Sequence, residues 1–295
     1  MKTFSIFSSI ILFLSIQSIA QDYSPYYNLG SKSGSISQMA SIVKNTAKSK
    51  GFTLIGEYAP GTQNDLYVLV FTNSTTISIT SKAHNQGVIA SSYRVGLEQK
   101  GTNIQITAVN PEYQWIAYLG KNYSKVESQL KTQKSGFDAF CKAIGNGELK
   151  AMGGKVKKSD LEEYQYMFGM PYFDDQIELE EFSSYEEGKK IIESKLENTP
   201  GITHVYTIQD PTRKVTIYGI GLVDQKIGEK HFLSIIGQEH VAALPYELIL
   251  EDDEALMLHG RFRFALYWPE LTMGTFTQIM STPGDCEDLL EKLVK

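Results

Sequence analysis

Cysteine is scarce in this sequence, which has only Cys141 and Cys286 among its 295 residues. The disulfide frameworks that hold small exported domains together need more cysteine pairs, so this class of protein is excluded. A single bridge between the two thiols stays open, because it depends on whether their Cα atoms come within about 7 Å of each other. We expect two free thiols.

Positive charge is also in short supply. The chain has 28 basic and 34 acidic residues, a net charge of −6, and the two signs are interspersed. Proteins that bind nucleic acids present a basic stripe to the phosphate backbone, so we expect no nucleic-acid partner. With 42% hydrophobic and 21% charged residues the composition is that of an ordinary globular protein, and the length suits two domains.

Long apolar runs are absent beyond the start of the chain. There, Lys2 precedes an apolar run at 6–16, and Ser18-Ile19-Ala20 forms a small-x-small site. This order is typical of a secretory signal peptide. The run is shorter than the about 20 residues that span a membrane, and an uncleaved anchor is the alternative. We expect residues 1–20 to be cleaved after Ala20, leaving a secreted or periplasmic protein without a membrane span.

The common catalytic signatures are missing. The sequence contains no Gly-x-Ser-x-Gly elbow, no His-Glu-x-x-His pair and no phosphate-binding loop that ends in Lys-Ser or Lys-Thr. The histidines stand singly in the sequence, at His84, His204, His231, His240 and His259. We therefore expect no cofactor, no metal site and no catalytic residue.

The strongest pattern after the leader is an internal repeat. Ser35-Ile36-Ser37-Gln38 and Ser184-Tyr185-Glu186-Glu187 both fit a capping box, in which a serine and a Gln or Glu satisfy the first N–H groups of a helix. Apolar residues at helical spacing follow each box, and a glycine suited to ending a helix comes next, Gly51 or Gly201. The sequence therefore predicts one helix behind each box.

Further elements follow in the same order in both parts of the chain. Strands are predicted at 23–29, 52–58, 66–71, 93–98 and 103–109, and again at 177–182, 202–208, 215–220, 246–251 and 255–259. Short helices are predicted at 75–83 and 227–236, and closing helices at 123–144 and 286–294. Corresponding landmarks lie 149 to 153 positions apart, a spacing too regular for chance.

The repeat predicts an α+β fold made of two tandem two-layer units. Each unit is a curved, mainly antiparallel sheet covered by helices, in the order β-α-β-β-(α)-β-β-α. We assign the first repeat domain to 21–149, a linker to 150–175 and the second repeat domain to 176–295. We expect the two copies to pack on each other with pseudo-twofold symmetry.

The linker is richer in large apolar residues than a spacer needs. These residues are Tyr164, Tyr166, Met167, Phe168, Met170, Tyr172 and Phe173. They either hold the two copies together or cover a pocket at their interface, because methionine and aromatic side chains line adaptable apolar sites. In the second case the candidate ligand-binding residues are these seven together with Trp115 and Trp268.

Several short stretches carry a family resemblance. They are Lys50-Gly51-Phe52-Thr53, the apolar run Val68-Leu69-Val70-Phe71-Thr72-Asn73, the hairpin that opens at Tyr93 or at Pro245-Tyr246, Leu266-Tyr267-Trp268-Pro269-Glu270-Leu271 and Ile279-Met280-Ser281-Thr282-Pro283-Gly284. The chain resembles the domain-of-unknown-function 302 family, present as two diverged tandem copies. The first copy departs from the pattern, with Asn110-Pro111-Glu112-Tyr113-Gln114-Trp115 where the second has its Trp-Pro motif. The resemblance implies a small α+β domain with a curved antiparallel sheet, and it implies no activity.

These observations favour an exported, non-enzymatic module that binds a small apolar ligand or a protein partner. The alternative is a hydrolase-like enzyme with an unrecognised site at the interface of the two repeats, using Asp174, Asp175, His231 or His240. A third possibility is a structural protein that docks onto a larger assembly. An enzyme should bring histidine and carboxylates together in a cleft, whereas a binding module should show a pocket with few titratable groups.

Overall fold

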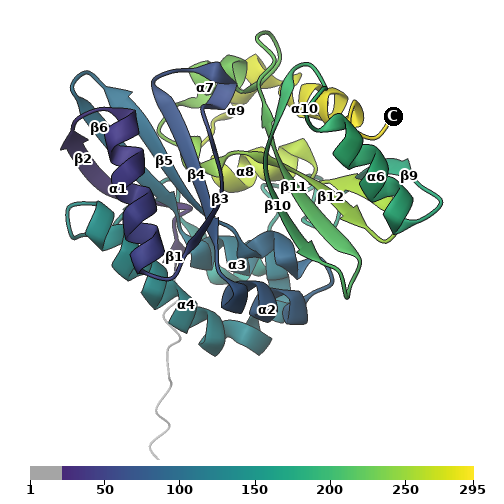
Figure 1. The fold of residues 1–295 in the computed structure, drawn as a ribbon, viewed down its shortest axis with the longest axis horizontal. Helices are drawn as coiled ribbons and strands as arrows, with labels where there is room; N and C mark the ends of the chain where they lie inside the picture. Colours follow the sequence, from purple (N-terminus) through teal and green to yellow (C-terminus); the bar gives the residue numbers. More distant parts are fainter. Residues whose placement is uncertain (1–21) are drawn as a thin grey trace, which may run out of the picture.

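The computed structural model describes residues 22–295, and the expected signal peptide lies outside this range. The described chain is α+β, as predicted, with two large antiparallel sheets side by side and helices around them (Figure 1). One sheet is built from strands of the first copy and the segment that follows it, and the other from strands of the second copy. Within residues 22–295 no helix combines the length and hydropathy that crossing a bilayer requires.

The first sheet has six strands in the order β3-β4-β5-β6-β2-β7. They are β2 (Tyr26–Ser33), β3 (Thr53–Tyr58), β4 (Leu66–Thr72), β5 (Tyr93–Lys100), β6 (Asn103–Val109) and β7 (Lys150–Met152). The central strands β4 and β5 are buried along most of their length on both faces. A sheet with near-continuous apolar strands at its centre needs a cover on each side.

The second sheet has five strands in the order β10-β11-β12-β13-β9. They are β9 (Ile177–Glu181), β10 (Ile202–Asp210), β11 (Val215–Leu222), β12 (Tyr246–Glu251) and β13 (Glu254–Met257). Every residue of β11 is buried, so this sheet is also covered on both faces. The strand order matches that of the first sheet element by element, except that the first sheet adds β7 at its edge.

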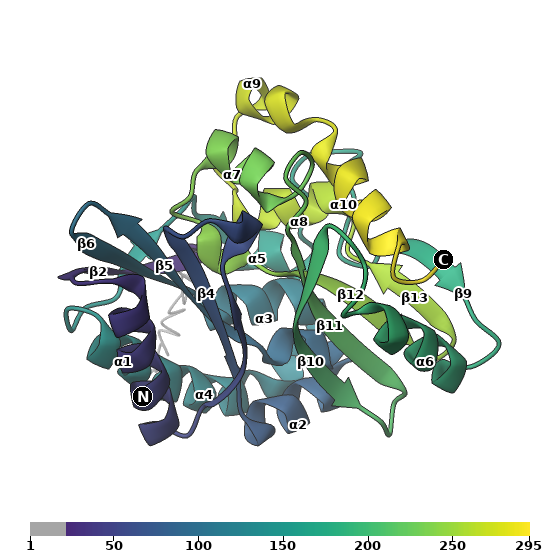
Figure 2. The ribbon, with the colours of Figure 1, turned by 45° about the horizontal axis from the view of Figure 1, so that its top comes forward.

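Helices cover the outer face of each sheet (Figure 2). The first sheet carries α1 (Ile36–Ser49) and α4 (Tyr123–Ile144), and the second carries α6 (Tyr185–Lys195) and α10 (Thr282–Glu291). In α1 the residues Met39, Val43 and Ala47 recur every fourth position and are all buried. Burying one large apolar side chain stabilises a fold by about 1.5 to 3 kcal/mol, so this stripe fixes the helix on the sheet.

The predicted helix caps are present, one of them in part. Around Ser35 both halves of the capping box form, and Gly51 takes the left-handed conformation that ends the first helix region, with φ 81°. Ser184 accepts the N–H of Glu187, but the Glu187 carboxylate reaches back to Ser183 rather than to Ser184. The prediction of a full second box was therefore wrong, because the neighbouring serine offers both its N–H and its hydroxyl.

Each copy also contains a helix that the sequence pattern did not predict. In the first copy α3 (Pro111–Leu119) follows the β5–β6 hairpin, and in the second α8 (Gly260–Tyr267) follows the β12–β13 hairpin. Every residue of α3 is buried, so this helix has no polar face and no amphipathic period. Its start was nevertheless marked, because Asn110 caps it and Pro111 occupies its first turn.

The two sheets meet along the edge strands β3 and β10. Each of these strands has an irregularity at the corresponding place, at Ile55 in β3 and at Val205 in β10. Gly56 lies so close to the partner strand that an added Cβ would come within 2.1 Å of the Val205 carbonyl oxygen. The absence of a side chain at Gly56 therefore lets the two copies approach backbone to backbone.

A short segment of each copy crosses to the other copy. From the second copy, α7 (Glu229–Ile236) contacts η1 (Pro60–Thr62), and η4 (Val241–Ala243) lies against β5 and β6. In the opposite direction η2 (Gly87–Ser91), which follows α2 (Ser74–Ala83), lies against β10 and β11. The contact of η4 with β4 is equivalent to that of η2 with β11, because β4 and β11 hold the same place in their sheets, and this agrees with the expected pseudo-twofold arrangement.

The segment predicted as a linker contains regular structure. β7 pairs with β2 in the first sheet, β8 (Val156–Lys157) pairs with β1 (Asp22–Tyr23), and α5 (Lys158–Glu162) packs against α3. The Gly154 N–H donates to Glu270 Oε2 of the second copy at 2.9 Å. The chain then crosses to the second copy over residues 163–176. The first sheet thus extends beyond residue 149 into this segment.

The last part of the chain closes the second copy. Three short helical pieces follow α8, namely α9 (Met273–Phe276), η5 (Thr277–Ile279) and α10. Cys286 of α10 and Cys141 of α4 are both buried free thiols, as the sequence favoured. Burial raises the pKa of each thiol above its ordinary value, so neither is a reactive thiolate at neutral pH.

Candidate functional site

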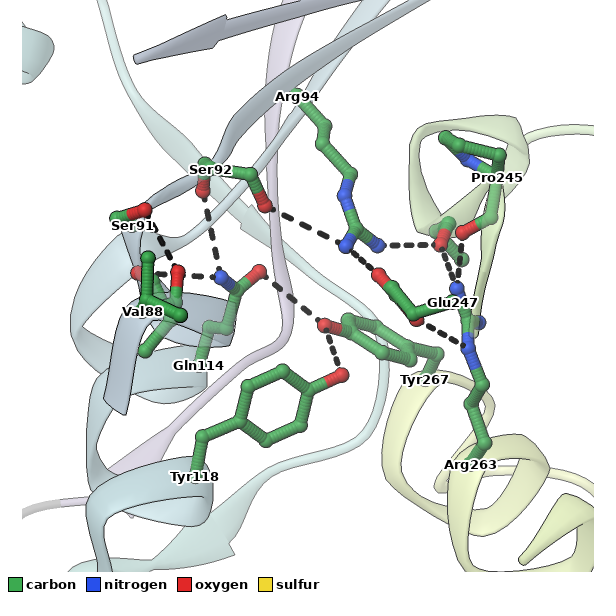
Figure 3. Close-up of polar contacts among 12 residues, drawn as sticks. Val88, Ser91, Ser92, Arg94, Gln114, Tyr118, Pro245, Glu247, Arg263 and Tyr267 are labelled. Carbon is green, nitrogen blue, oxygen red and sulfur yellow. Dashed lines mark hydrogen bonds and ion pairs between the residues drawn. The ribbon is translucent and has the colours of Figure 1, made fainter. Parts of the chain in front are cut away.

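A cluster of polar and charged side chains is buried where the two copies meet (Figure 3). We call it the axis cluster, and it consists of Arg94, Gln114, Tyr118, Glu247, Arg263 and Tyr267. None of the six is more than 2% exposed. The strands β5 and β12 supply Arg94 and Glu247, and the two helices that sequence reasoning missed, α3 and α8, supply the other four.

Glu247 holds both arginines of the axis cluster. Its Oε1 accepts a short hydrogen bond from Arg94 Nη2, and its Oε2 accepts a hydrogen bond from Arg263 Nε at 3.0 Å. Both arginines also donate to the Ala243 carbonyl, at 2.7 and 2.9 Å. Burial lowers the pKa of a guanidinium, but Glu247 and the nearby Tyr118 and Tyr267 together outweigh burial and keep the pKa of Arg94 and Arg263 above the ordinary value. The two side chains are therefore charged.

A chain of hydrogen bonds continues into the first copy. The hydroxyl oxygens of Tyr118 and Tyr267 lie 3.0 Å apart, and the Tyr267 hydroxyl donates to Gln114 Oε1 at 3.2 Å. Gln114 Nε2 in turn donates to the Ser92 carbonyl at 3.3 Å. Because such bonds polarise one another in a dry interior, the network holds its members in one arrangement.

The axis cluster has no room for a ligand. One carboxylate faces two guanidiniums, so the cluster carries a net charge of +1 away from water. The space beside Arg263, between Phe232 and Trp268, is too small for a water molecule. This cluster therefore positions the two copies, and the ligand site must be sought elsewhere.

A second buried carboxylate also joins the copies. Glu229 of α7 is fully buried and accepts three hydrogen bonds, from the Tyr58 hydroxyl at 2.7 Å, the Gly61 N–H at 2.9 Å and the Leu222 N–H at 3.0 Å. Tyr58 and Gly61 belong to the first copy. Burial raises the pKa of Glu229 from 4.5 to about 7, although the three donors act in the opposite direction.

Glu229 gives the stability of the protein a dependence on pH. The folded protein keeps a proton on Glu229 that the unfolded chain releases near pH 4.5, so this part of the stability is complete below pH 4.5 and is lost as pH rises through about 7. We expect the unfolding free energy of the native protein to fall by about 2 to 3 kcal/mol more than that of Glu229→Gln over this range. Urea titrations between pH 4.5 and 8 measure this difference. The exposed Glu193→Gln should follow the native curve, and parallel curves for Glu229→Gln would contradict the assignment.

The best candidate for a ligand site is a cleft between the first copy and the linker. We call it the linker pocket. It has a volume of about 420 Å³, within the range of small-molecule sites. Its aromatic lining comes from Tyr118 of α3 and from Tyr164, Tyr172 and Phe173 of the linker. Phe173 is wedged between Tyr118 of the first copy and Phe262 of the second, with ring centroids 5.2 and 5.9 Å away.

The rim of the linker pocket is polar. It includes His84, Lys121, Glu162, Glu163 and Asp174. Lys121 forms an ion pair with Glu163, and Lys158 lies 3.9 Å from Glu162. Asp174 has no ion-pair partner among residues 22–295. Burial lowers the pKa of His84 below its ordinary value, so its ring is neutral at pH 7.

A smaller apolar groove lies on the second copy. It is lined by Tyr166 and Met170 of the linker and by Arg261, Ala265, Trp268, Leu271, Met273 and Phe276. Its volume is only about 40 Å³, enough for a water molecule or two but not for an organic ligand. The Tyr166 hydroxyl donates to the Leu271 carbonyl at 3.4 Å, so here the linker packs on the second copy.

The structure divides the nine predicted ligand-binding residues among several places. Tyr164, Tyr172 and Phe173 line the linker pocket, whereas Tyr166, Met170 and Trp268 line the apolar groove. Met167 and Phe168 line neither, and Phe168 is fully exposed. Trp115 is buried in the first copy, where its Nε1 donates to the Ala90 carbonyl at 2.9 Å. Trp115 is thus part of the core and lines neither the linker pocket nor the apolar groove.

The residues proposed for a hydrolase do not converge. Asp174 is at the linker pocket, whereas His240 is buried beside Glu270 of the second copy, with Nε2 2.5 Å from Oε1. His231 lies on α7, and Asp175 accepts the Tyr172 N–H in a turn at 2.9 Å. Between residues 22 and 295 no three His, Cys, Asp or Glu side chains come together in a way that could hold a metal ion.

Sequence reasoning missed the axis cluster and most of the rim of the linker pocket. A signal for the cluster was present, since Arg94 and Glu247 are charged residues that stand between apolar residues at corresponding positions of the repeat. His84, Lys121 and Glu162 had no such signal. They come from three separate segments that only the tertiary fold brings together.

Comparison of the chain with protein-family models and with curated proteins gave no match. The resemblance to the domain-of-unknown-function 302 family therefore stays a proposal, based on the order of elements and on the stretches named above. The function has to be argued from the site alone.

Proposed function

We propose that the protein is an exported, non-enzymatic binding module and that the linker pocket is its ligand site. The observation that carries the proposal is a cleft of about 420 Å³ between the first copy and the linker, with aromatic side chains on its walls and polar groups at its rim. Ligand sites are typically concave, with a few polar groups that orient a ligand held by apolar contacts. Three of the candidate aromatic residues, Tyr164, Tyr172 and Phe173, support the proposal by lining the cleft. A fourth, Tyr166, holds the linker on the second copy.

The chemistry of the lining points to a small molecule with two different sides. Tyr172 and Phe173, which are not fully buried, offer ring surface to an apolar or flat face of the ligand, and the buried Tyr118 and Tyr164 complete the aromatic lining. Asp174, without an ion-pair partner in the described chain, and the neutral His84 offer hydrogen bonds or a negative charge to the polar side. A ligand that is apolar on one face and carries hydroxyl or amino groups on the other fits this lining better than a purely apolar one.

Native mass spectrometry of the protein purified from its own host tests the proposal. We expect a bound mass that is lost on denaturation. In titrations with the molecule so identified, Tyr172→Ala and Asp174→Asn should each weaken binding at least about ten-fold, because each removes one direct contact. Both side chains are at the surface, so the unfolding midpoint should stay the same.

Phe168→Ala is the matched control for these variants. Phe168 belongs to the same segment and is fully exposed, but it does not line the linker pocket. We expect this variant to bind as the native protein does. A native protein without bound mass, or equal affinities for all three variants, would rule out the linker pocket as the ligand site.

A hydrolase-like reaction is the second candidate, and the linker pocket is also where it would have to occur. His84 and three carboxylates line the same cleft. However, His84 Nδ1 accepts the Gln86 N–H at 3.2 Å, so the neutral ring carries its proton on Nε2 and has no free lone pair to act as a base. The geometry therefore favours binding. Turnover of the bound molecule that disappears in His84→Gln would reverse this preference.

A further inference from the structure

The axis cluster contains residues that occupy equivalent positions in the two copies. Arg94 and Glu247 are both the second residue of their strand, β5 and β12, and they lie 153 positions apart. Tyr118 and Tyr267 lie near the ends of α3 and α8, 149 positions apart. Gln114 of α3 and Arg263 of α8 are also 149 positions apart.

The contacts of these residues are also equivalent. Gln114 donates to the carbonyls of Ala90 and Ser92 in the first copy. Arg263 donates to the carbonyls of Ala243 and Pro245, which hold the same places in the second copy. The helices α3 and α8 therefore hold the start of the β5–β6 hairpin and of the β12–β13 hairpin, respectively, through equivalent hydrogen bonds.

Two residues contact their own counterparts. Arg94 pairs with Glu247, and the hydroxyl oxygens of Tyr118 and Tyr267 lie 3.0 Å apart. Only residues next to a two-fold axis meet their own equivalents, as in an isologous dimer. The two copies thus associate as the subunits of a two-fold dimer do, although they belong to one chain.

The charges on this axis break the symmetry. If two first copies paired with each other, Arg94 would face Arg94, and if two second copies paired, Glu247 would face Glu247. Both positions are fully buried, where a pair of like charges is not screened by water. Like charges brought together at an interface cost several kcal/mol, whereas the Arg94–Glu247 pair is satisfied.

We infer that the face between the two copies is a two-fold association surface whose partner is chosen by the charges of Arg94 and Glu247. A first copy accepts only a second copy, from its own chain or from another chain. This surface makes each half of the protein competent to exchange with the matching half of another molecule. The inference does not depend on the linker pocket or on any ligand.

Two charge-reversed full-length chains test this choice of partner. Arg94→Glu places two carboxylates on the axis, and Glu247→Arg adds a third guanidinium. We expect each variant alone to lose at least about ten-fold of its folded monomer, because neither can pair its own copies. When the two are refolded together, the unchanged first copy of one chain can pair with the unchanged second copy of the other. We expect a dimer with one chain of each kind, at least about ten-fold more abundant than either homodimer.

The measurement is native mass spectrometry of the mixture, with one variant labelled with ¹⁵N to tell the chains apart. A fourfold variant, with Arg94→Glu, Glu247→Arg, Gln114→Arg and Arg263→Gln, serves as the second arm because it exchanges the two sets of equivalent residues within one chain. We expect it to fold as a monomer. Recovery of the folded state by mixing or by the fourfold exchange supports the inference. Single variants that stay monomeric with the native midpoint, a statistical mixture of dimers, or failure of both routes to recover the fold would overturn it.

Discussion

Glu247→Gln is expected to lower the unfolding free energy by about 3 to 5 kcal/mol, which is the largest effect that we predict for a single substitution. The change is nearly isosteric, so it leaves no cavity. Within residues 22–295 it removes the only carboxylate that forms an ion pair with the Arg94 and Arg263 guanidiniums, which are 0% and 2% exposed. Two buried positive charges would then stand together without a counter-charge, and the penalty of burying them would no longer be offset.

Urea denaturation of the purified full-length protein measures this loss as a shift of the midpoint. The matched control is Glu148→Gln at the surface ion pair with Lys150, where both side chains are more than 70% exposed and the charged atoms lie 3.6 Å apart. Exposed pairs of this kind contribute about 0 to 1 kcal/mol, so the control should hardly differ from the native protein. Equal shifts for the two variants would show that the axis cluster does not depend on its charges.

Local signals in the sequence predicted the outer layer of the fold well. The capping box at Ser35 and the stripe of Met39, Val43 and Ala47 predicted α1, because a helix that is polar on one side shows its period in the sequence. The closing helix of the first copy was placed at 123–144, where the structure has α4. The predicted strands and the steady spacing between corresponding elements indicated two antiparallel sheets with the same succession of elements, as the structure has them.

The inner layer could not be predicted in the same way. The helix α3 packs against η2, α4 and α5 and is buried along its whole length. Its sequence therefore lacks the alternation of apolar and polar faces by which a helix is predicted. The residues that join the copies, Arg94 and Glu247, lie 153 positions apart, and their pairing follows only from the way the copies pack. The same holds for the linker pocket, whose rim collects His84, Lys121 and Asp174 from three segments.

Gly56→Ala is expected to destabilise the protein by about 3 kcal/mol, which is the second largest effect that we predict. The added Cβ would lie 2.1 Å from the Val205 carbonyl oxygen and 2.8 Å from its carbon. Atoms of a backbone strand cannot move aside as the end of a flexible side chain can, so β3 and β10 would have to separate. Hydrogen exchange followed by mass spectrometry should show β3 and β10 losing protection before α1, which packs on the outer face of the first sheet.

Gly136→Ala is the matched control for this change. Gly136 lies on the exposed side of α4, and an added Cβ there would meet no atom within 4 Å. Alanine is the better helix former by about 0.5 to 1 kcal/mol, so this variant should be slightly more stable than the native protein. Opposite signs for the same chemical change would place the cost of Gly56→Ala in the contact between the two copies. If Gly56→Ala were tolerated, the edge strands would have to be free to slide apart, and the backbone-to-backbone junction would not be what holds the two sheets together.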